Sequence, residues 1–299
     1  MRAAQAFCWT VLVVTLALWS GNWIVARAVR EEVAPGIATV GRLVIVLAIL
    51  LPFAFAGLKR KWHDLKRRDW KIVAALGFTG GGIHLALQWL GLHYTTATSG
   101  ILYLSTTPIF ILLMAIPLGE HVGLRQYLGV AISFCGVFLI ATRGAPAALS
   151  FNPGDLMALA SMMMWAGYTV LLRLRRDALD TAELLTLVCL FGLAFMLPWL
   201  AWELAFHPKI ELTREGALGV VYSAIGSFLL AYIGWSYVVK RMGAVRAGAT
   251  MHLMPAFGVI LAAIFLAEYP RWFHFTGIGL ILAGVTLSSF RASSASSIR

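Results

Sequence analysis

The chain has 299 residues, of which 60% are hydrophobic and only 12% are charged, and its mean hydropathy is +0.83. A soluble globular protein does not carry that much apolar surface. The formal net charge of +11 does not indicate a nucleic-acid-binding protein, because the basic residues lie in short links between apolar runs and not on one basic face. The composition therefore predicts an all-α polytopic membrane protein embedded in the lipid bilayer.

Apolar runs long enough to cross a hydrocarbon core of ~30 Å recur along the whole chain. They predict ten transmembrane helices, at residues 7–29, 36–56, 71–92, 97–118, 124–142, 155–173, 183–202, 216–239, 245–266 and 272–290. The first run is longer than the ~7–15-residue core of a signal peptide and contains Trp19, Asn22 and Trp23, so we expect it to remain a membrane helix.

The basic residues also predict the orientation. With the N-terminus inside, most of the 24 lysines and arginines fall in the inner loops and tails, and the densest group lies in the link 57–69. Positively charged loops favour the cytoplasmic side of a membrane. Both termini are therefore expected in the cytoplasm.

One pattern occurs twice in the sequence. Its first copy is Pro108, Glu120, Gly129 and Gly136, and its second is Pro255, Glu268, Gly277 and Gly284. The copies are offset by 147 residues at the proline and by 148 at the other positions, and Trp19 aligns with Trp165 at an offset of 146. The chain is thus predicted to contain two homologous halves, 1–148 and 149–299. Five spans per half is an odd number, so the second half enters the membrane inverted, as in many transporters.

The repeated proline, glutamate and glycines resemble the drug/metabolite transporter (DMT) superfamily, in its ten-helix EamA-type branch. The resemblance covers both halves. Within the superfamily the chain is similar to bacterial amino-acid and metabolite exporters, among them the YddG-type aromatic amino-acid exporters. The resemblance implies a cavity between the first four helices of each half, with the fifth and tenth helices behind it as supports.

The prolines and glutamates of the repeated pattern each have two interpretations. Pro108 and Pro255 remove a helix hydrogen bond near mid-span, so each produces either a static kink or a hinge for gating. Glu120 and Glu268 end the fourth and ninth spans, where a carboxylate opposes the helix dipole. Each is therefore predicted to be a structural cap or half of a helix-end ion pair that takes part in gating.

The glycines of the pattern are predicted to be packing residues. Gly129, Gly136, Gly277 and Gly284 would let helices approach closely in lipid. The three cysteines lie inside apolar runs without metal or disulfide spacing, so we expect them to pack as small apolar residues. No metal and no cofactor is predicted.

Polar and aromatic side chains at membrane depth predict a central cavity. Polar groups are costly in lipid and usually face a bundle interior. The candidate cavity residues are Trp19, Asn22, Trp23, His84, Gln88, Tyr103, Trp165, Tyr168, Tyr232 and His252. The alternatives are lipid-facing packing for the tryptophans and a hydrogen bond to a nearby backbone carbonyl for each histidine.

The pathway is predicted to be largely uncharged. No Asp, Glu or Lys lies in the middle of an expected span. Arg27 and Arg42 come near, toward the outer side, where Glu31 and Glu32 are available as partners. An uncharged aromatic cavity suits a neutral or zwitterionic metabolite.

We therefore predict a bacterial inner-membrane secondary carrier, not an enzyme. It would export amino acids and related small metabolites by alternating access, and the preference for aromatic or hydrophobic amino acids rests mainly on the resemblance. A lipophilic-cation or drug exporter is the alternative, although no deep acid offers a counter-charge. A membrane-embedded enzyme is disfavoured because HExxH, Gly-x-Ser-x-Gly and paired acids beside a histidine are absent. A receptor or channel is disfavoured by the duplication. Proton coupling and facilitated diffusion both stay open, as does the oligomeric state.

Overall fold

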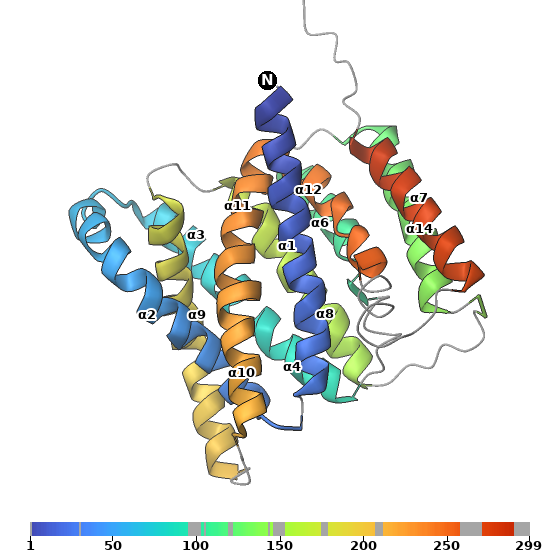
Figure 1. Cartoon of the computed structure of the whole chain (residues 1–299). Coiled ribbons are helices and arrows are strands. Elements are labelled where there is room, and N and C mark those ends of the chain that lie inside the picture. Colours follow the sequence, from blue (N-terminus) through green and yellow to red (C-terminus); the bar gives the residue numbers. More distant parts are fainter. Residues whose placement is uncertain are drawn as a thin grey trace, which may run out of the picture.

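The computed structural model of the chain describes residues 2–29, 31–94, 103–104, 106–118, 122–142, 144–145, 153–174, 179–206, 212–257 and 271–289. These residues form helices and turns and no strand. Figure 1 shows the helices as one bundle, with α1 beside α11 and α2 beside α9.

The first half contains α1 (Arg2–Ala28), α2 (Pro35–Lys61), α3 (Arg67–Leu76), the π-helical segment η1 (Gly77–Ile83), α4 (His84–Tyr94), α6 (Thr107–Ala115) with a 3₁₀ turn at Ile116–Leu118, and α7 (Leu124–Ala141). The segments α3, η1 and α4 follow one another without a break and together form the third expected span.

The second half contains α8 (Pro153–Leu174), α9 (Thr181–Phe206), α10 (Arg214–Tyr222), the π-helical segment η4 (Ser223–Leu230), α11 (Ala231–Met242), α12 (Ala244–Thr250) and α14 (Trp272–Ser289). Here α10, η4 and α11 are continuous and form the eighth expected span.

The described helices fit a multi-pass membrane protein. Six are long and apolar enough to cross a bilayer, and shorter apolar helices lie at 107–118, 124–140 and 272–288. Each coincides with a predicted span. The expected ninth span, 245–266, is described only to residue 257. Helix α2 continues to Lys61, past its predicted end at 56, because the basic residues of its last turn interact favourably with the helix dipole.

Two backbone irregularities recur at corresponding places in the halves. The π-helical segments begin at Gly77 and Ser223, which are 146 residues apart. Pro52 lies inside α2 and Pro198 inside α9, again 146 residues apart. Local π-helical turns often accompany functional sites. The offset of the sequence pattern thus reappears in the shapes of the second, third, seventh and eighth spans.

Helices α2 and α9 pack antiparallel through two buried glutamates. At one end the backbone N–H of Gly36 donates to Glu203 Oε2 at 2.9 Å. At the other end Lys61 Nζ lies 2.7 Å from Glu183 Oε2, and Glu183 also lies directly against Gly57. The two contacts are equivalent in the repeat, because Gly36 corresponds to Glu183 and Gly57 corresponds to Glu203.

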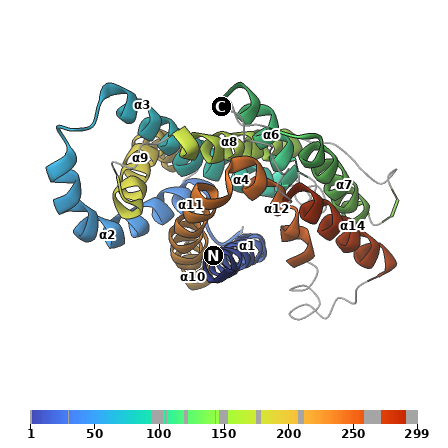
Figure 2. The same ribbon diagram turned by 90° about the horizontal axis from the view of Figure 1, so that it is seen from above.

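Helices α7 and α14 form a second antiparallel pair, in which backbone meets backbone. A Cβ atom on Gly129 would lie 2.5 Å from the carbonyl oxygen of Gly284, and one on Gly136 would lie 2.5 Å from that of Gly277. Between them Ser133 Oγ donates to the carbonyl of Ile281 at 3.3 Å. Figure 2 shows this pair at one end of the molecule, with α2 and α3 at the other.

Candidate substrate pocket

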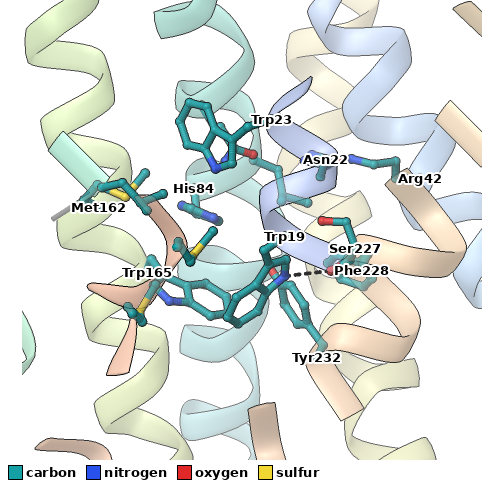
Figure 3. A pocket seen from close by; sticks show the side chains of 15 residues that line it. Trp19, Asn22, Trp23, Arg42, His84, Met162, Trp165, Ser227, Phe228 and Tyr232 are labelled. Carbon is teal, nitrogen blue, oxygen red and sulfur yellow. Dashed lines mark hydrogen bonds between the residues drawn. The ribbon is translucent and has the colours of Figure 1, made fainter. Parts of the chain in front are cut away.

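A buried pocket lies between the two halves, and side chains from α1, α2, α4, α8, η4 and α11 contribute to its wall (Figure 3). Its lining residues are Trp19, Asn22, Trp23, Arg42, His84, Leu85, Gln88, Leu104, Met162, Trp165, Ser227, Phe228, Tyr232, Met251 and Met254. The open space is about 40 Å³, which holds about three water molecules.

Aromatic rings form one side of the pocket. Trp19 of α1 and Trp165 of α8 meet edge to face, with ring centres 5.0 Å apart and an interplanar angle of 85°. Tyr168 stacks on Trp165 at 5.0 Å, and Tyr232 lies 5.1 Å from it. Such pairs are favoured beyond the burial of their area. The two tryptophans that align between the halves are thus in direct contact.

The two indoles differ in their hydrogen bonding. Trp19 Nε1 donates to the carbonyl of Ser227 at 2.9 Å, as Figure 3 shows. Ser227 lies in η4, where the π-helical geometry changes the usual backbone pairing. Trp165 Nε1 is buried and has no hydrogen-bond partner among the described residues. Trp165 is therefore the indole with a free donor at the pocket.

His84 is held by the helix opposite it. Its Nδ1 lies 3.0 Å from the carbonyl oxygen of Ser161 and 2.8 Å from Ser161 Oγ. The Ser161 hydroxyl in turn donates to the His84 carbonyl at 2.9 Å. A carbonyl oxygen only accepts, so the contact with the Ser161 carbonyl requires a proton on Nδ1, and in the neutral ring Nε2 is then an acceptor. His84 therefore makes the hydrogen bond to a backbone carbonyl that was the alternative interpretation, and it also lines the pocket.

Arg42 of α2 brings a charge into the pocket wall. Its side chain is 1% exposed, and Cζ lies 5.7 Å from the centre of the Trp89 ring. Its Nε and Nη2 have no hydrogen-bond partner among the described residues. The alternative of a pair with Glu31 or Glu32 is therefore not found for Arg42, which is a charged residue in a lining predicted to be largely uncharged. The sequence signal was an arginine well inside an expected span.

The pocket contains seven of the ten predicted cavity residues, namely Trp19, Asn22, Trp23, His84, Gln88, Trp165 and Tyr232. Tyr168 lies behind Trp165. Tyr103 and His252 are buried but do not line the pocket. Arg42 and the apolar lining residues Leu85, Leu104, Phe228, Met251 and Met254 were not predicted to line the cavity. Apolar pocket residues have the same sequence pattern as ordinary packing residues, so no local signal separates them.

The prolines of the repeated pattern lie next to breaks in their spans. Pro108 occupies the first turn of α6, where the missing N–H costs little. Pro255 lies in the helical stretch 253–257, after a turn at 251–252. Neither therefore interrupts a continuous described helix, and the hinge role stays a prediction. Glu120 and Glu268 lie outside the described residues.

Apolar helices of membrane-spanning length around a buried, partly polar pocket define a multi-pass membrane transporter. Residues 7–142 and 152–290 each match the EamA-like transporter family. The chain belongs to that family, and the predicted resemblance to the DMT superfamily is confirmed.

Several curated proteins are similar over nearly the whole chain. An uncharacterized transporter of Archaeoglobus fulgidus is 27% identical over 281 residues, covering 93% of this chain and 96% of the relative. A probable terminal-alkyne amino-acid exporter of Streptantibioticus cattleyicolor is 26% identical over 284 residues, covering 94% and 92%. A crystal structure with 20% identity superposes with a TM-score of 0.76 over 95% of this chain and 96% of its own, which shows a shared fold.

Proposed function

We propose that this transporter exports amino acids and related small metabolites, and that aromatic or hydrophobic amino acids are favoured. The observation that carries the proposal is the buried pocket in which Trp19 and Trp165 meet. Aromatic and methionine side chains there suit an apolar side chain. The relative from Streptantibioticus cattleyicolor, named as a probable exporter of an amino acid, supports this substrate class.

The mechanism we propose is alternating access between two inverted halves, 1–148 and 149–299. Reciprocal contacts support it. Exchanging the halves converts the Gly36–Glu203 contact into the Gly57–Glu183 contact, and it converts Gly129–Gly284 into Gly136–Gly277. Two halves that can exchange roles have two related ways to open, one to each side of the membrane.

Opening is required because the pocket is too small for its proposed cargo. A space of about 40 Å³ holds water but not an amino acid. The breaks before Pro108 and Pro255 are the proposed hinges, and Met162, Met251 and Met254 provide a wall that can change rotamer. We propose that the small pocket belongs to a step of the cycle in which no cargo is bound.

We place the carrier in the inner membrane with both termini in the cytoplasm, on the basic residues of the inner loops. A cytoplasm-specific reporter fused after Arg299 tests this orientation. Activity of the fusion agrees with it, and activity of a periplasm-specific reporter at the same site contradicts it.

The test of function is uptake into proteoliposomes of labelled phenylalanine, tryptophan, methionine, threonine, a dicarboxylate and a lipophilic cation, each with and without a pH gradient. We expect saturable uptake of the neutral amino acids. Dependence on the gradient would indicate proton coupling, and its absence would indicate facilitated diffusion. Uptake of the lipophilic cation alone would reject the proposal in favour of a drug exporter, which the guanidinium in the pocket disfavours.

Trp165→Ala is the variant that links the pocket to transport. It removes the ring that contacts Trp19, Tyr168 and Tyr232. We expect uptake to fall by about tenfold, which corresponds to the loss of one aromatic contact of about 1.4 kcal/mol. Trp62→Ala is the control, since Trp62 is 51% exposed and lies outside the pocket. Equal uptake by both variants would contradict the assignment of the pocket.

A further inference from the structure

We propose that Arg42 is the carboxylate-binding group of the pocket. The substrate would then be a monocarboxylate with an apolar or aromatic body, of which aromatic amino acids are one kind. This inference rests on the proposed function and deepens it, because it names the chemical group by which the cargo is recognised.

The position of Arg42 requires an explanation. It lies seven residues after Pro35, the first residue of α2, and so roughly 10 Å along the helix. The side chain is 1% exposed. A guanidinium at that depth is costly unless something compensates its charge. No Asp or Glu lines the described pocket, and no ion pair joins Arg42 to a described carboxylate.

The guanidinium has an aromatic neighbour, but two of its donors have no partner among the described residues. Trp89, itself 1% exposed, lies at 5.7 Å from Cζ. Because Cζ lies over the indole ring, the contact is a cation–π interaction that favours the charged group. The edge donors Nε and Nη2 have no hydrogen-bond partner among the described residues. A carboxylate presents two oxygens that match such adjacent donors in a bidentate pair.

Asn22 provides a further donor on the same side. The hydroxyl of Ser223 donates to Asn22 Oδ1. This bond assigns the oxygen of the amide and leaves its NH₂ group as a donor. Figure 3 shows the Arg42 side chain reaching toward Asn22 on one side of the pocket, and Met162 and Trp165 on the other. A carboxylate end and an apolar end are therefore separated within one site.

The second half of the chain contains no counterpart of this charge. The contacts of Gly36 and Gly57 relate α2 to α9 by offsets of 147 and 146 residues. By these offsets the position of the second half that corresponds to Arg42 is Cys189 or Val188, and both residues are fully buried. The shared scaffold therefore packs without a charge at this position. Because the scaffold does not need this charge, we infer that its role is to bind an anionic group of the ligand.

The pocket offers less to an ammonium group. Its described lining includes no carboxylate, and the hydroxyl of Tyr232 already donates to the carbonyl of Gly80 at 2.7 Å. The uncharged acceptors in its described lining include the amide oxygen of Gln88 and, in the neutral ring, Nε2 of His84. We therefore expect the carboxylate of the cargo to be essential and its amino group to be dispensable.

The experiment compares three compounds with the same phenyl body. Uptake of labelled phenylalanine into proteoliposomes is challenged with unlabelled 3-phenylpropionate, which lacks the amine, and with phenethylamine, which lacks the carboxylate. We expect 3-phenylpropionate to compete and phenethylamine not to compete. Equal competition by phenethylamine would overturn the role of Arg42 while leaving amino-acid export in place.

The variants are Arg42→Met and Arg42→Lys, with Arg60→Met as the matched control, because Arg60 is an exposed arginine on the same helix. Arg42→Met should reduce phenylalanine uptake by about ten- to a hundredfold, the loss of one charged hydrogen-bonded pair. Arg42→Lys keeps the charge but lacks the two adjacent donors that bind a carboxylate in a bidentate pair, so its uptake should be intermediate. Full uptake by Arg42→Met would reject the inference.

Thermal unfolding of the purified protein separates a ligand role from a structural one. Without ligand, Arg42→Met should unfold at the same temperature as the parent or higher, because it removes an uncompensated buried charge. A marked decrease would instead indicate a structural role. With 3-phenylpropionate, the parent and Arg60→Met should be stabilised and Arg42→Met should not. If the parent transports no amino acid, the proposed function fails, and this shift still decides whether Arg42 binds a carboxylate.

Discussion

The α7–α14 pair and the pocket both join the two halves of the chain, but they do so in different ways. Between α7 and α14 the contact of Gly129 with Gly284 is the counterpart, in the repeat, of the contact of Gly136 with Gly277. In the pocket the aligned residues Trp19 and Trp165 meet, yet their hydrogen bonds differ. Arg42 has no charged counterpart in the second half. The repeated glycines therefore belong to the helix scaffold, whereas the pocket combines aligned tryptophans with the unmatched Arg42, the residue for which we propose a role in recognition.

The largest effect on stability is expected at the α7–α14 contact. Gly136→Ala places a methyl group 2.5 Å from the carbonyl oxygen of Gly277. Backbone cannot move aside as a flexible side chain can, so we expect a loss of about 1–3 kcal/mol. Thermal unfolding in detergent, or the fraction of monodisperse protein, measures it.

Gly279→Ala is the control for that substitution, because a Cβ at Gly279 of α14 meets nothing within 4 Å. Alanine has the higher helix propensity, so this variant should be neutral or slightly stabilising. Equal destabilisation by both alanines would mean that the close approach of the two helices is not what the glycines provide.

The next effect distinguishes the two tryptophans of the pocket. Trp19→Phe removes the donor of the Ser227 carbonyl, whereas Trp165→Phe removes an indole N–H that has no described partner. Trp19→Phe should therefore destabilise the unliganded protein by about 1 kcal/mol more. The transport defect should follow the opposite order if the free N–H of Trp165 meets the cargo. Identical behaviour of the two variants in both assays would show that the aligned tryptophans are equivalent after all.

The smallest effect is expected at the α2–α9 contact. Glu183→Gln removes the charge that pairs with Lys61 but keeps an oxygen that can accept from the N–H of Asp180. Because the Lys61 side chain is 36% exposed, water can solvate the released ammonium. We expect a loss below about 1 kcal/mol, and one that shrinks at high salt. Glu215→Gln, an exposed position on α10, is the reference. A loss of several kcal/mol would instead place this pair among the main supports of the contact.

Much of the site was predictable because aromatic and polar residues are unusual in a membrane span. His84, Gln88 and Trp165 were assigned to the cavity on that ground, and all three line the pocket. Tyr103 and His252 were assigned by the same rule, yet they are buried elsewhere. A polar side chain in an apolar span is expected to be buried in the protein, but the surface against which it packs depends on the neighbouring helices.

The sequence by itself determined the repeat offset of 146–148 residues and the membership in a transporter family, and it predicted spans with which the described apolar helices coincide, because hydropathy and spacing are local along the chain. The tertiary structure alone decided that Arg42 faces the pocket without an acidic partner among the described residues, and that each glycine of α7 meets a particular carbonyl of α14. The physical reason is that the free energy of a buried charge, and that of a close backbone contact, depend on groups far away in the sequence. Only the packing of the helices brings those groups together.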